Sequence, residues 1–258
     1  MNFTNYLDSY RMTKIIREIR VYKKKNKMKV EIWSDVMCPF CYIGKRKFEN
    51  ALAQFTHKDD VEIVWKSFQL NPYMETNPNK SINEYLAEAK GWTLAQAKEA
   101  NQYVTQVAQQ VGLTYNMDKA VVANSFDAHR FSHLAKQHGL QDAAEERLFK
   151  AYFTEGANTG DHATLMQLGT EIGLDADEVK TMLDSDLYAD EVKQDIYEAQ
   201  QVGVRGVPFF VLNEKYAVSG AQESALFLQA LNQTWAETVK TKPTTIAEGA
   251  TCDIDGNC

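Results

Sequence analysis

The chain has 258 residues, of which 44% are hydrophobic, and its formal net charge is −7. This length and apolar content can bury a sizeable core, either as one large domain or as one domain with an insertion. An acidic chain without a broad basic face argues against nucleic-acid binding. Its apolar runs are shorter than the roughly 18 residues that span a bilayer. We therefore expect a globular protein that neither binds nucleic acid nor spans a membrane.

Residues 1–27 differ from the rest of the chain in charge, with eight Lys or Arg residues against two acids, Asp8 and Glu18. Charged residues interrupt the apolar ones, so the continuous apolar segment of an export signal is missing. We therefore predict a cytoplasmic protein. We interpret the segment as a flexible basic extension, with Met28 as an alternative chain start. A helix that binds a membrane surface or a partner is the other interpretation.

The first predicted elements follow a β-α-β order. Residues 28–34 alternate between apolar and polar, which predicts a half-buried strand, and residues 61–68 show the same alternation. Between them, apolar residues recur at near-helical spacing from Ile43 to Phe55. The region around Pro72 and Pro78 reads as a loop.

From about Ser81 to Gln201 the pattern is helical throughout. Capping boxes that begin at Ser81 and Thr93 open it, because their side chains can satisfy free backbone N–H groups. Asp161 and Asp175 are further candidate N-caps. Three glycines stand where periodic segments stop, as helix C-terminal glycines do: Gly112, Gly139 and Gly173.

The strand pattern returns at residues 208–212 and 216–219, and a helix follows. A sheet protein with a helical block in the middle requires the two sheet halves to close on each other, with the block over one edge. We therefore predict a domain made of residues 28–78 and 202–240, a helical insertion over residues 79–201, and a tail over residues 241–258.

The four cysteines form two close pairs, Cys38 with Cys41 and Cys252 with Cys258. Four are too few for a disulfide-stapled secreted scaffold. The first pair lies where a strand becomes a helix, and Pro39 suits the first helical position. There, free N–H groups and the helix dipole favour a thiolate at an exposed Cys38, while Cys41 lies one turn further in and is shielded.

This asymmetry is what thiol–disulfide exchange requires. Cys38 would attack a disulfide to give a mixed disulfide, and Cys41 would resolve it. A structural zinc site usually takes four Cys or His ligands, and the second cysteine pair has a different spacing. A static disulfide is disfavoured in a reducing cell, and two unrelated core cysteines are the remaining alternative.

A second element of the site is predicted around Pro208, which opens a strand after a glycine-flanked turn. Cis X-Pro bonds favour such turns. A cis Val207–Pro208 bond would direct the backbone of Val207 toward an incoming peptide or thiol.

These motifs together resemble the cytosolic FrnE-like branch of the thioredoxin-fold DsbA family, over residues 28–238. The resemblance rests on the Cys-Pro-Phe-Cys motif, the helical insertion, Gly-Val-Pro-Phe-Phe before a hairpin, and residues 124–130 and 148–156. It implies an α/β thioredoxin fold with a large all-helical insertion. It also implies a protein disulfide oxidoreductase or isomerase, with Cys38 as nucleophile, Cys41 as resolving thiol and Pro208 as the cis-proline beside them.

The sequence departs from the family pattern at two places. Thioredoxins carry a buried acid six residues before the first cysteine, and here that position is Ile32, with Glu31 and Asp35 on the opposite strand face by alternation. Proton transfer from Cys41 must then use water or another group. The dipeptide between the cysteines is Pro-Phe instead of the Pro-His of typical DsbA, so a very low thiol pKa is not expected.

Met37 and Phe40 are expected at the surface, as an apolar lip that holds an unfolded substrate segment beside Pro39 and Val207. The expected partners are disulfide-containing or unfolded proteins and a cellular thiol reductant. No metal or organic cofactor is expected, and glutathione is a candidate reductant or co-substrate.

Two other functions remain as alternatives. The related 2-hydroxychromene-2-carboxylate isomerase and kappa-class glutathione transferase families share the fold plan, which leaves a glutathione-dependent isomerase or transferase as an alternative. Those families typically carry serine at the position of Cys38. A holdase that uses the apolar lip alone is the non-enzymatic alternative.

Polar residues of the insertion give weaker signals. His129 and His133 are four residues apart on a predicted helix, but no adjacent acid completes a metal site, so exposed or capping histidines are the preferred interpretation. Asn124, His129 and Arg130 either line the face toward Cys38 or join helices through hydrogen bonds, and we favour the second.

Cys252 and Cys258 enclose five residues, including Gly256. A second disulfide is geometrically feasible there and could exchange with Cys38 as a second redox pair. Untethered thiols or weak metal binding are the alternatives.

Overall fold

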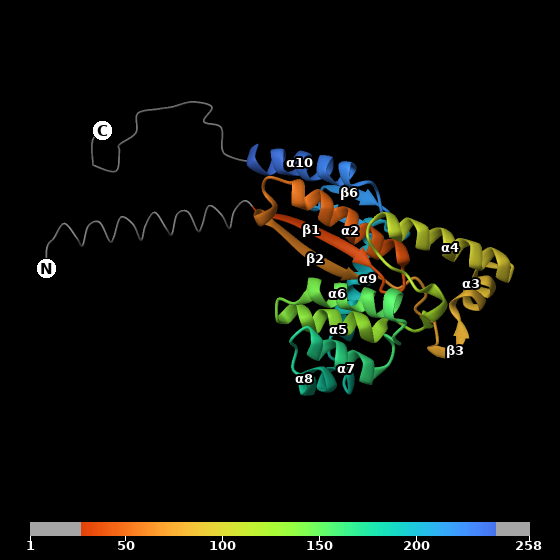
Figure 1. Cartoon of the computed structure of the whole chain (residues 1–258). Helices are drawn as coiled ribbons and strands as arrows, with labels where there is room; N and C mark the ends of the chain where they lie inside the picture. The colour runs from red at the N-terminus through yellow and green to blue at the C-terminus, as the bar shows by residue number, and fades with distance from the viewer. Residues whose placement is uncertain (1–26, 241–258) are drawn as a thin grey trace, which may run out of the picture.

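A four-stranded sheet forms the centre of the computed structural model, which describes residues 27–240. The strand order is β2-β1-β5-β6 (Figure 1). β1 (Met28–Ser34) pairs in parallel with β2 (Val61–Ser67) and antiparallel with β5 (Phe209–Leu212). β6 (Tyr216–Ser219) completes a hairpin with β5. The predicted closure of the two sheet halves is confirmed, and β1 and β5 form the seam.

Two helices, α2 (Pro39–Gln54) and α10 (Ser224–Lys240), lie side by side over one face of the sheet (Figure 1). Three aromatic rings join these two helices to the sheet. Phe48 of α2 lies 5.5 Å from Phe210 of β5 and 5.7 Å from Phe227 of α10, measured between ring centroids. Such tilted and edge-on contacts add to the stabilisation from burial. The sheet and the helix that carries the cysteines therefore share one core.

The opposite face of the sheet is covered by α9 (Ala189–Val202). Trp33 of β1 is buried there with Ala199 and Val211. Its indole N–H donates to the backbone oxygen of Asp195 at 2.9 Å. Because side chains alternate along β1, Trp33 faces α9 while the residues before and after it face α2. The sheet is therefore buried on both faces.

The insertion is seated on β2, the edge strand. The Gln141 side chain accepts a hydrogen bond from the backbone N–H of Trp65 at 3.1 Å and donates one to its carbonyl at 3.0 Å. Asp195 accepts one from the backbone N–H of Ser67 at 2.9 Å. Exposed edge groups would otherwise be free to pair with another chain. Side chains of the insertion therefore replace a missing neighbouring strand.

The predicted helix starts at Ser81, Thr93, Asp161 and Asp175 are confirmed by side-chain capping bonds. These four residues cap α3 (Ile82–Lys90), α4 (Leu94–Gln110), α7 (His162–Glu171) and α8 (Ala176–Leu183), in that order. The region also contains α5 (Phe126–Gln137) and α6 (Gln141–Phe149), in addition to α9. The short turns are η1 (Lys58–Asp60), η2 (Met117–Lys119) and the π-helical η3 (Lys150–Glu155).

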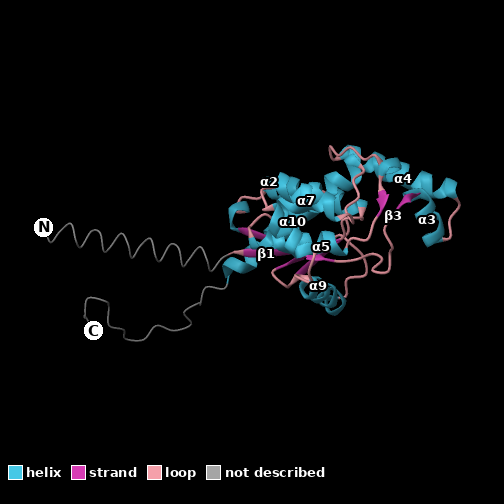
Figure 2. Cartoon of the chain, turned by 90° about the horizontal axis from the view of Figure 1, so that it is seen from below, coloured by secondary structure: helices cyan, strands magenta, loops and turns pink. Residues whose placement is uncertain are grey.

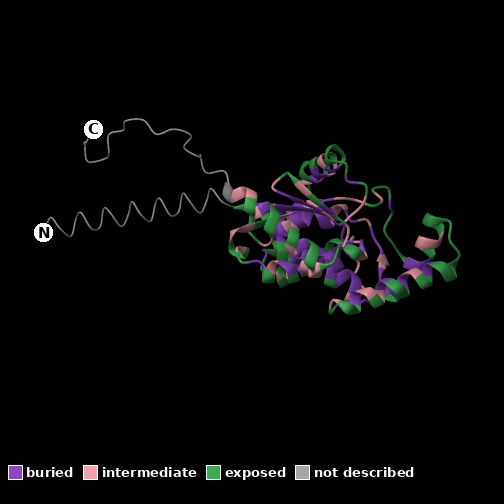
Figure 3. Ribbon diagram, turned by 90° about the horizontal axis from the view of Figure 1, so that it is seen from above, coloured by how far each residue is buried: buried purple, intermediate pink, exposed green. Residues whose placement is uncertain are grey.

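The prediction of a wholly helical insertion needs one correction. β3 (Asn77–Ser81) pairs antiparallel with β4 (Val121–Val122), because the chain returns from α4 alongside the loop that precedes α3. Together, β3, β4, α3 and α4 form an arm that projects from the rest of the molecule (Figure 2). This arm is more exposed than the centre of the molecule (Figure 3). None of the helices within residues 27–240 is long and apolar enough to cross a membrane.

Helix α2 and the turn before β5 approach closely at Gly44. A Cβ atom at Gly44 would lie 2.9 Å from Cγ of Pro208 and 3.5 Å from Cζ of Phe210. Glycine therefore sets how near the cysteine-bearing helix comes to Pro208.

We expect Gly44→Ala to lower the free energy of unfolding by about 1 kcal/mol in urea denaturation. Alanine in a helix interior gains about 1 kcal/mol over glycine. Overlap with a proline ring, which cannot rotate away, costs about 1–3 kcal/mol and outweighs this gain. Gly206→Ala is the control, because a Cβ there meets nothing within 4 Å. A Gly44→Ala variant as stable as the parent would contradict the close packing.

Candidate active site

Cys38 is the N-cap residue of α2, and Pro39 occupies the start of the helix. Because Cys38 is the N-cap residue, it lies at the positive end of the helix dipole, as predicted. Its side chain makes no capping hydrogen bond. The prediction of an exposed residue is wrong, since Cys38 is only 5% exposed. The loop before β5 covers it, and its thiol donates to the carbonyl of Val207 at 3.3 Å.

The Val207–Pro208 peptide bond is cis, as predicted. The Val207 carbonyl faces Cys38 although the two residues are 169 positions apart in the sequence. The backbone of Val207 is therefore beside the sulfur, where a substrate chain could pair with it.

Cys41 lies inside the first turn of α2 and is 1% exposed. Burial raises the pKa of its thiol well above the usual value, and the neighbouring Cys38 raises it further. The Ser34 hydroxyl and the backbone of Asp35 act against this increase and lower the pKa of Cys41. The Ser34 hydroxyl is buried near Cys41 and makes no hydrogen bond within residues 27–240. A buried hydroxyl at the end of β1 is therefore the polar side chain near the Cys41 thiol, while Ile32 occupies the position of the thioredoxin acid.

Asp35 joins the two loops that flank the cysteines. Its carboxylate accepts hydrogen bonds from the backbone N–H of Met37 at 3.3 Å and of Leu70 at 2.7 Å. Asp35 does not continue the alternation of β1, because the strand ends at Ser34 and the chain turns there. The sequence signal for this role is the position of the acid, because a carboxylate between a strand end and a helix start can accept loop N–H groups.

His129 and His133 are both buried, so the prediction of exposed or capping histidines is wrong. His133 bonds Asp195 at 3.0 Å, while His129 Nε2 lies 3.6 Å from Asp35. Burial opposes protonation of His129, but the carboxylates of Asp35 and Glu145 outweigh it and raise the pKa of the imidazole. The two histidines thus face different acids, and no group of three potential metal ligands occurs in the part of the chain described.

Asn124 and Arg130 join elements, as we favoured. The Asn124 side chain accepts from the backbone N–H of Phe126 at 2.9 Å and donates to the carbonyl of Met74 at 2.7 Å. The Arg130 guanidinium donates to the carbonyl of Leu187 at 2.8 Å. These side chains stabilise loops of the insertion and make no bond to the cysteines.

Tyr115 reaches the site from the loop after α4, and sequence reasoning missed it. Its hydroxyl donates to the carbonyl of Pro39 at 2.7 Å. Its ring stacks 4.6 Å from Phe153 and 6.2 Å from Tyr42, between centroids. Burial raises the pKa of Tyr115, which keeps its hydroxyl protonated as a donor. An isolated tyrosine between two helices carries no pattern that identifies such a contact.

Of the other predicted site residues, Phe40 is 37% exposed, as expected of an apolar lip. Met37 and Pro39 are half-buried and line a cavity beside the cysteines. Cys252, Cys258 and residues 1–26 lie outside the described residues, so the interpretations placed on them stay predictions.

The match to known families agrees with this geometry. The model of the DSBA-like thioredoxin domain matches residues 29–232. The chain belongs to the DSBA-like thioredoxin family. It is similar to a probable DsbA oxidoreductase from Streptomyces coelicolor, at 39% identity and a TM-score of 0.78, over 90% of this chain and 98% of that one.

Two further similarities are more distant. The uncharacterised protein YwbO of Bacillus subtilis strain 168 is 27% identical over 205 residues, which cover 79% of this chain and 95% of YwbO. A 2-hydroxychromene-2-carboxylate isomerase is 14% identical with a TM-score of 0.60, over 83% of this chain and all of that one, and shows a shared fold alone. The predicted α/β thioredoxin fold with a helical insertion is therefore confirmed, within an oxidoreductase family.

The titration of Cys41 gives a test of the site. In a variant with Cys38, Cys252 and Cys258 replaced by serine, Cys41 is the one remaining thiol. Because its pKa is raised, its thiolate fraction below pH 9 is smaller than that of a free cysteine with a pKa of about 8.5. We expect iodoacetamide to alkylate it more slowly in the native state than in guanidinium, as followed by mass spectrometry.

The shape of the pH profile matters more than its absolute rate, because burial also limits access of the reagent. The native rate should keep rising above about pH 9, where the rate for the unfolded chain levels off. The raised pKa would be contradicted if the native alkylation rate levels off at the same pH as the rate of the unfolded chain, or at a lower pH.

Proposed function

We propose that this protein is a thiol–disulfide oxidoreductase or isomerase that acts on protein or small-thiol disulfides through Cys38 and Cys41. The observation that carries the proposal is the position of Cys38 at the start of α2, facing the Val207 carbonyl beside a cis Pro208. Cys41 lies behind it and is shielded from solvent. The proposed nucleophile thus lies next to the backbone of Val207, and the proposed resolving thiol lies next to the nucleophile.

The reaction consists of two exchanges. The Cys38 thiolate attacks one sulfur of a substrate disulfide, so a mixed disulfide forms and the other substrate sulfur leaves as a thiolate that takes a proton. The Cys41 thiolate then attacks the Cys38 sulfur, which closes the Cys38–Cys41 disulfide and releases the second substrate thiol. The substrate gains two electrons and the dithiol loses two. The same steps in reverse oxidise a substrate dithiol.

Continued reduction requires a thiol that reopens the Cys38–Cys41 disulfide. Two molecules of a cellular thiol such as glutathione supply this electron pair in two successive exchanges and leave as one disulfide, and neither exchange requires a metal or an organic cofactor. Because such reductants are abundant in the cytoplasm, we place the activity there.

The proposal is tested by the redox equilibrium of Cys38 and Cys41 in glutathione buffers, read by alkylation and peptide mass spectrometry. We expect a reversible disulfide between the two residues. A Cys41→Ser variant should accumulate a mixed disulfide at Cys38, because the resolving thiol is missing, and Cys38→Ser should form none. Running the titration again with Cys252 and Cys258 changed to serine shows whether the tail pair shifts the equilibrium.

Two results would favour other functions. If Cys38 takes up glutathione and no Cys38–Cys41 disulfide forms, a glutathione-dependent isomerase or transferase becomes the better interpretation. If the activity toward unfolded protein survives the Cys38→Ser substitution, a holdase becomes the better interpretation.

Ser34 gives a separate prediction for the resolving step. Its hydroxyl lowers the pKa of the buried Cys41 thiol, so Ser34→Ala should slow the attack of Cys41 on a preformed mixed disulfide. Because the hydroxyl makes no hydrogen bond within residues 27–240, it can bond the Cys41 thiolate as this forms, and the loss of a net hydrogen bond of about 1 kcal/mol corresponds to roughly a fivefold slower step. Acid-quenched time courses of the mixed disulfide measure this rate. Ser219→Ala, at an exposed position of β6, is the matched control. Equal rates for the two variants would remove Ser34 from the mechanism.

A further inference from the structure

A cavity of about 350 Å³ lies next to the residues that flank Cys38. Met37 and Pro39 form part of its wall, and most of the rest comes from α3 and the loop after β2, with single residues from α4, η2 and η3. Volumes of a few hundred Å³ and mainly apolar walls are typical of ligand sites. Its larger apolar side chains are Met37, Leu70, Met74, Ile82, Leu86 and Met117.

The floor of this cavity is polar. Asp35 and Tyr152 line it and are each 1% exposed, whereas Leu70 at the mouth is 53% exposed. The Tyr152 hydroxyl has no hydrogen-bond partner within residues 27–240. Burial, followed by the charge of Asp35, raises the pKa of Tyr152, so the hydroxyl stays protonated. An unpartnered buried hydroxyl is costly, which indicates that a ligand or water satisfies it.

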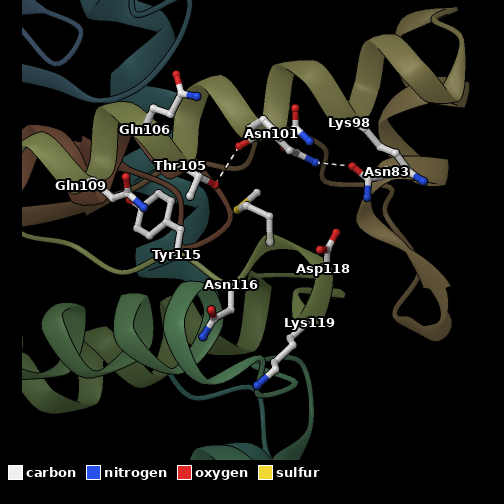
Figure 4. A pocket seen from close by; sticks show the side chains of 12 residues that line it. Asn83, Lys98, Asn101, Thr105, Gln106, Gln109, Tyr115, Asn116, Asp118 and Lys119 are labelled. Atoms are coloured by element: carbon white, nitrogen blue, oxygen red, sulfur yellow. Dashed lines mark hydrogen bonds between the residues drawn. The ribbon is translucent and has the colours of Figure 1, made fainter.

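A larger hollow of about 720 Å³ shares Asn101 and Met117 with this cavity, and its other lining residues lie mostly along α4 and around η2 (Figure 4). It is lined mostly by amide and charged side chains of α4 and η2, and it does not touch the residues that flank Cys38. Asn101 already donates to the side chain of Asn83 at 2.8 Å. This hollow therefore has neither the apolar walls nor the unsatisfied polar group of the smaller cavity.

We propose that the smaller cavity binds a tyrosine side chain of a protein substrate, close in sequence to the cysteine that Cys38 attacks. This proposal rests on the proposed function. A phenol ring suits the apolar walls, and its hydroxyl can donate to the Asp35 carboxylate and accept from Tyr152. Three methionines in the wall adapt to the ring and its neighbours. Because Met37 and Pro39 flank Cys38, one substrate chain can reach both the cavity and the sulfur.

The carboxylate in the floor also excludes competitors. Asp35 is buried, so a second negative charge next to it would be unfavourable, whereas Lys90 also lines the cavity but is exposed and would favour an anion only at the mouth. Glutathione disulfide carries four carboxylates and is a poor fit. Phenylalanine fills the same volume but leaves the Tyr152 hydroxyl without a partner.

The test uses disulfide-linked peptides that differ at one position, placed one to three residues from the cysteine: tyrosine, phenylalanine or serine. For the parent protein we expect kcat/KM to be about tenfold higher for tyrosine than for phenylalanine, and lowest for serine. In Tyr152→Phe the preference for tyrosine over phenylalanine should fall, because the substrate hydroxyl keeps only the bond to Asp35, while the preference of both over serine remains. Its free energy of unfolding should be at least that of the parent, because a buried unpartnered hydroxyl is removed.

A second variant tests the cavity through its mouth. Ala89 is exposed at the rim, so Ala89→Trp should bring the tyrosine-to-serine ratio toward one. Ala143→Trp, at an exposed position of α6 outside the cavity, is the matched control and should keep the ratio of the parent.

The outcomes separate the two proposals. If no peptide and no glutathione disulfide is reduced, the proposed function fails. If all peptides are reduced at equal rates, or if Tyr152→Phe keeps the full tyrosine preference of the parent, the tyrosine site fails while the oxidoreductase stands. The tyrosine site would also be overturned, in favour of a small-thiol site, if glutathione disulfide is reduced faster than the tyrosine peptide and Ala89→Trp slows that reduction.

Discussion

The pairing of β1 with β5 is the interaction on which the site depends. It brings the turn that ends in Pro208 against the helix that begins after Cys38, although the helical insertion separates them in sequence. The distance between them is set at Gly44, where a side chain would meet the Pro208 ring. The insertion can be long because its ends return to one sheet, and because Gln141 and Asp195 cover the exposed edge of β2.

Opposing electrostatic effects divide the work between the two cysteines. Cys38 lies at the start of a helix, where partial positive charge favours an anion. Cys41 is buried, and burial disfavours its thiolate more than the Ser34 hydroxyl and the Asp35 backbone favour it. One thiol therefore suits attack on a substrate and the other suits a delayed attack on its neighbour, even without the strand acid of thioredoxins.

The insertion does more than cover the sheet. Tyr115 holds the first turn of α2 through the Pro39 carbonyl, and His129 lies against Asp35 behind the loops around the site. Helix α3 and Tyr152 turn the space beside Met37 into a cavity with apolar walls and a polar floor. In the proposed mechanism the thioredoxin core thus supplies the nucleophilic sulfur, while the insertion supplies most of the cavity that lies beside it.

The sequence by itself determined the four strands of the central sheet, the capped helices, the closure of that sheet and the position of the Cys38–Cys41 pair, because these follow from local periodicity and from motifs within a few residues. It did not determine the pairing of β3 with β4, the burial of Cys38, the roles of Asp35, Tyr115 and Ser34, or the placement of the histidines. Each of these depends on contacts between segments far apart in the chain. Alternation placed Asp35 on a strand face, but the chain turns at Ser34, and only the tertiary structure shows the loops and the histidine that surround its carboxylate.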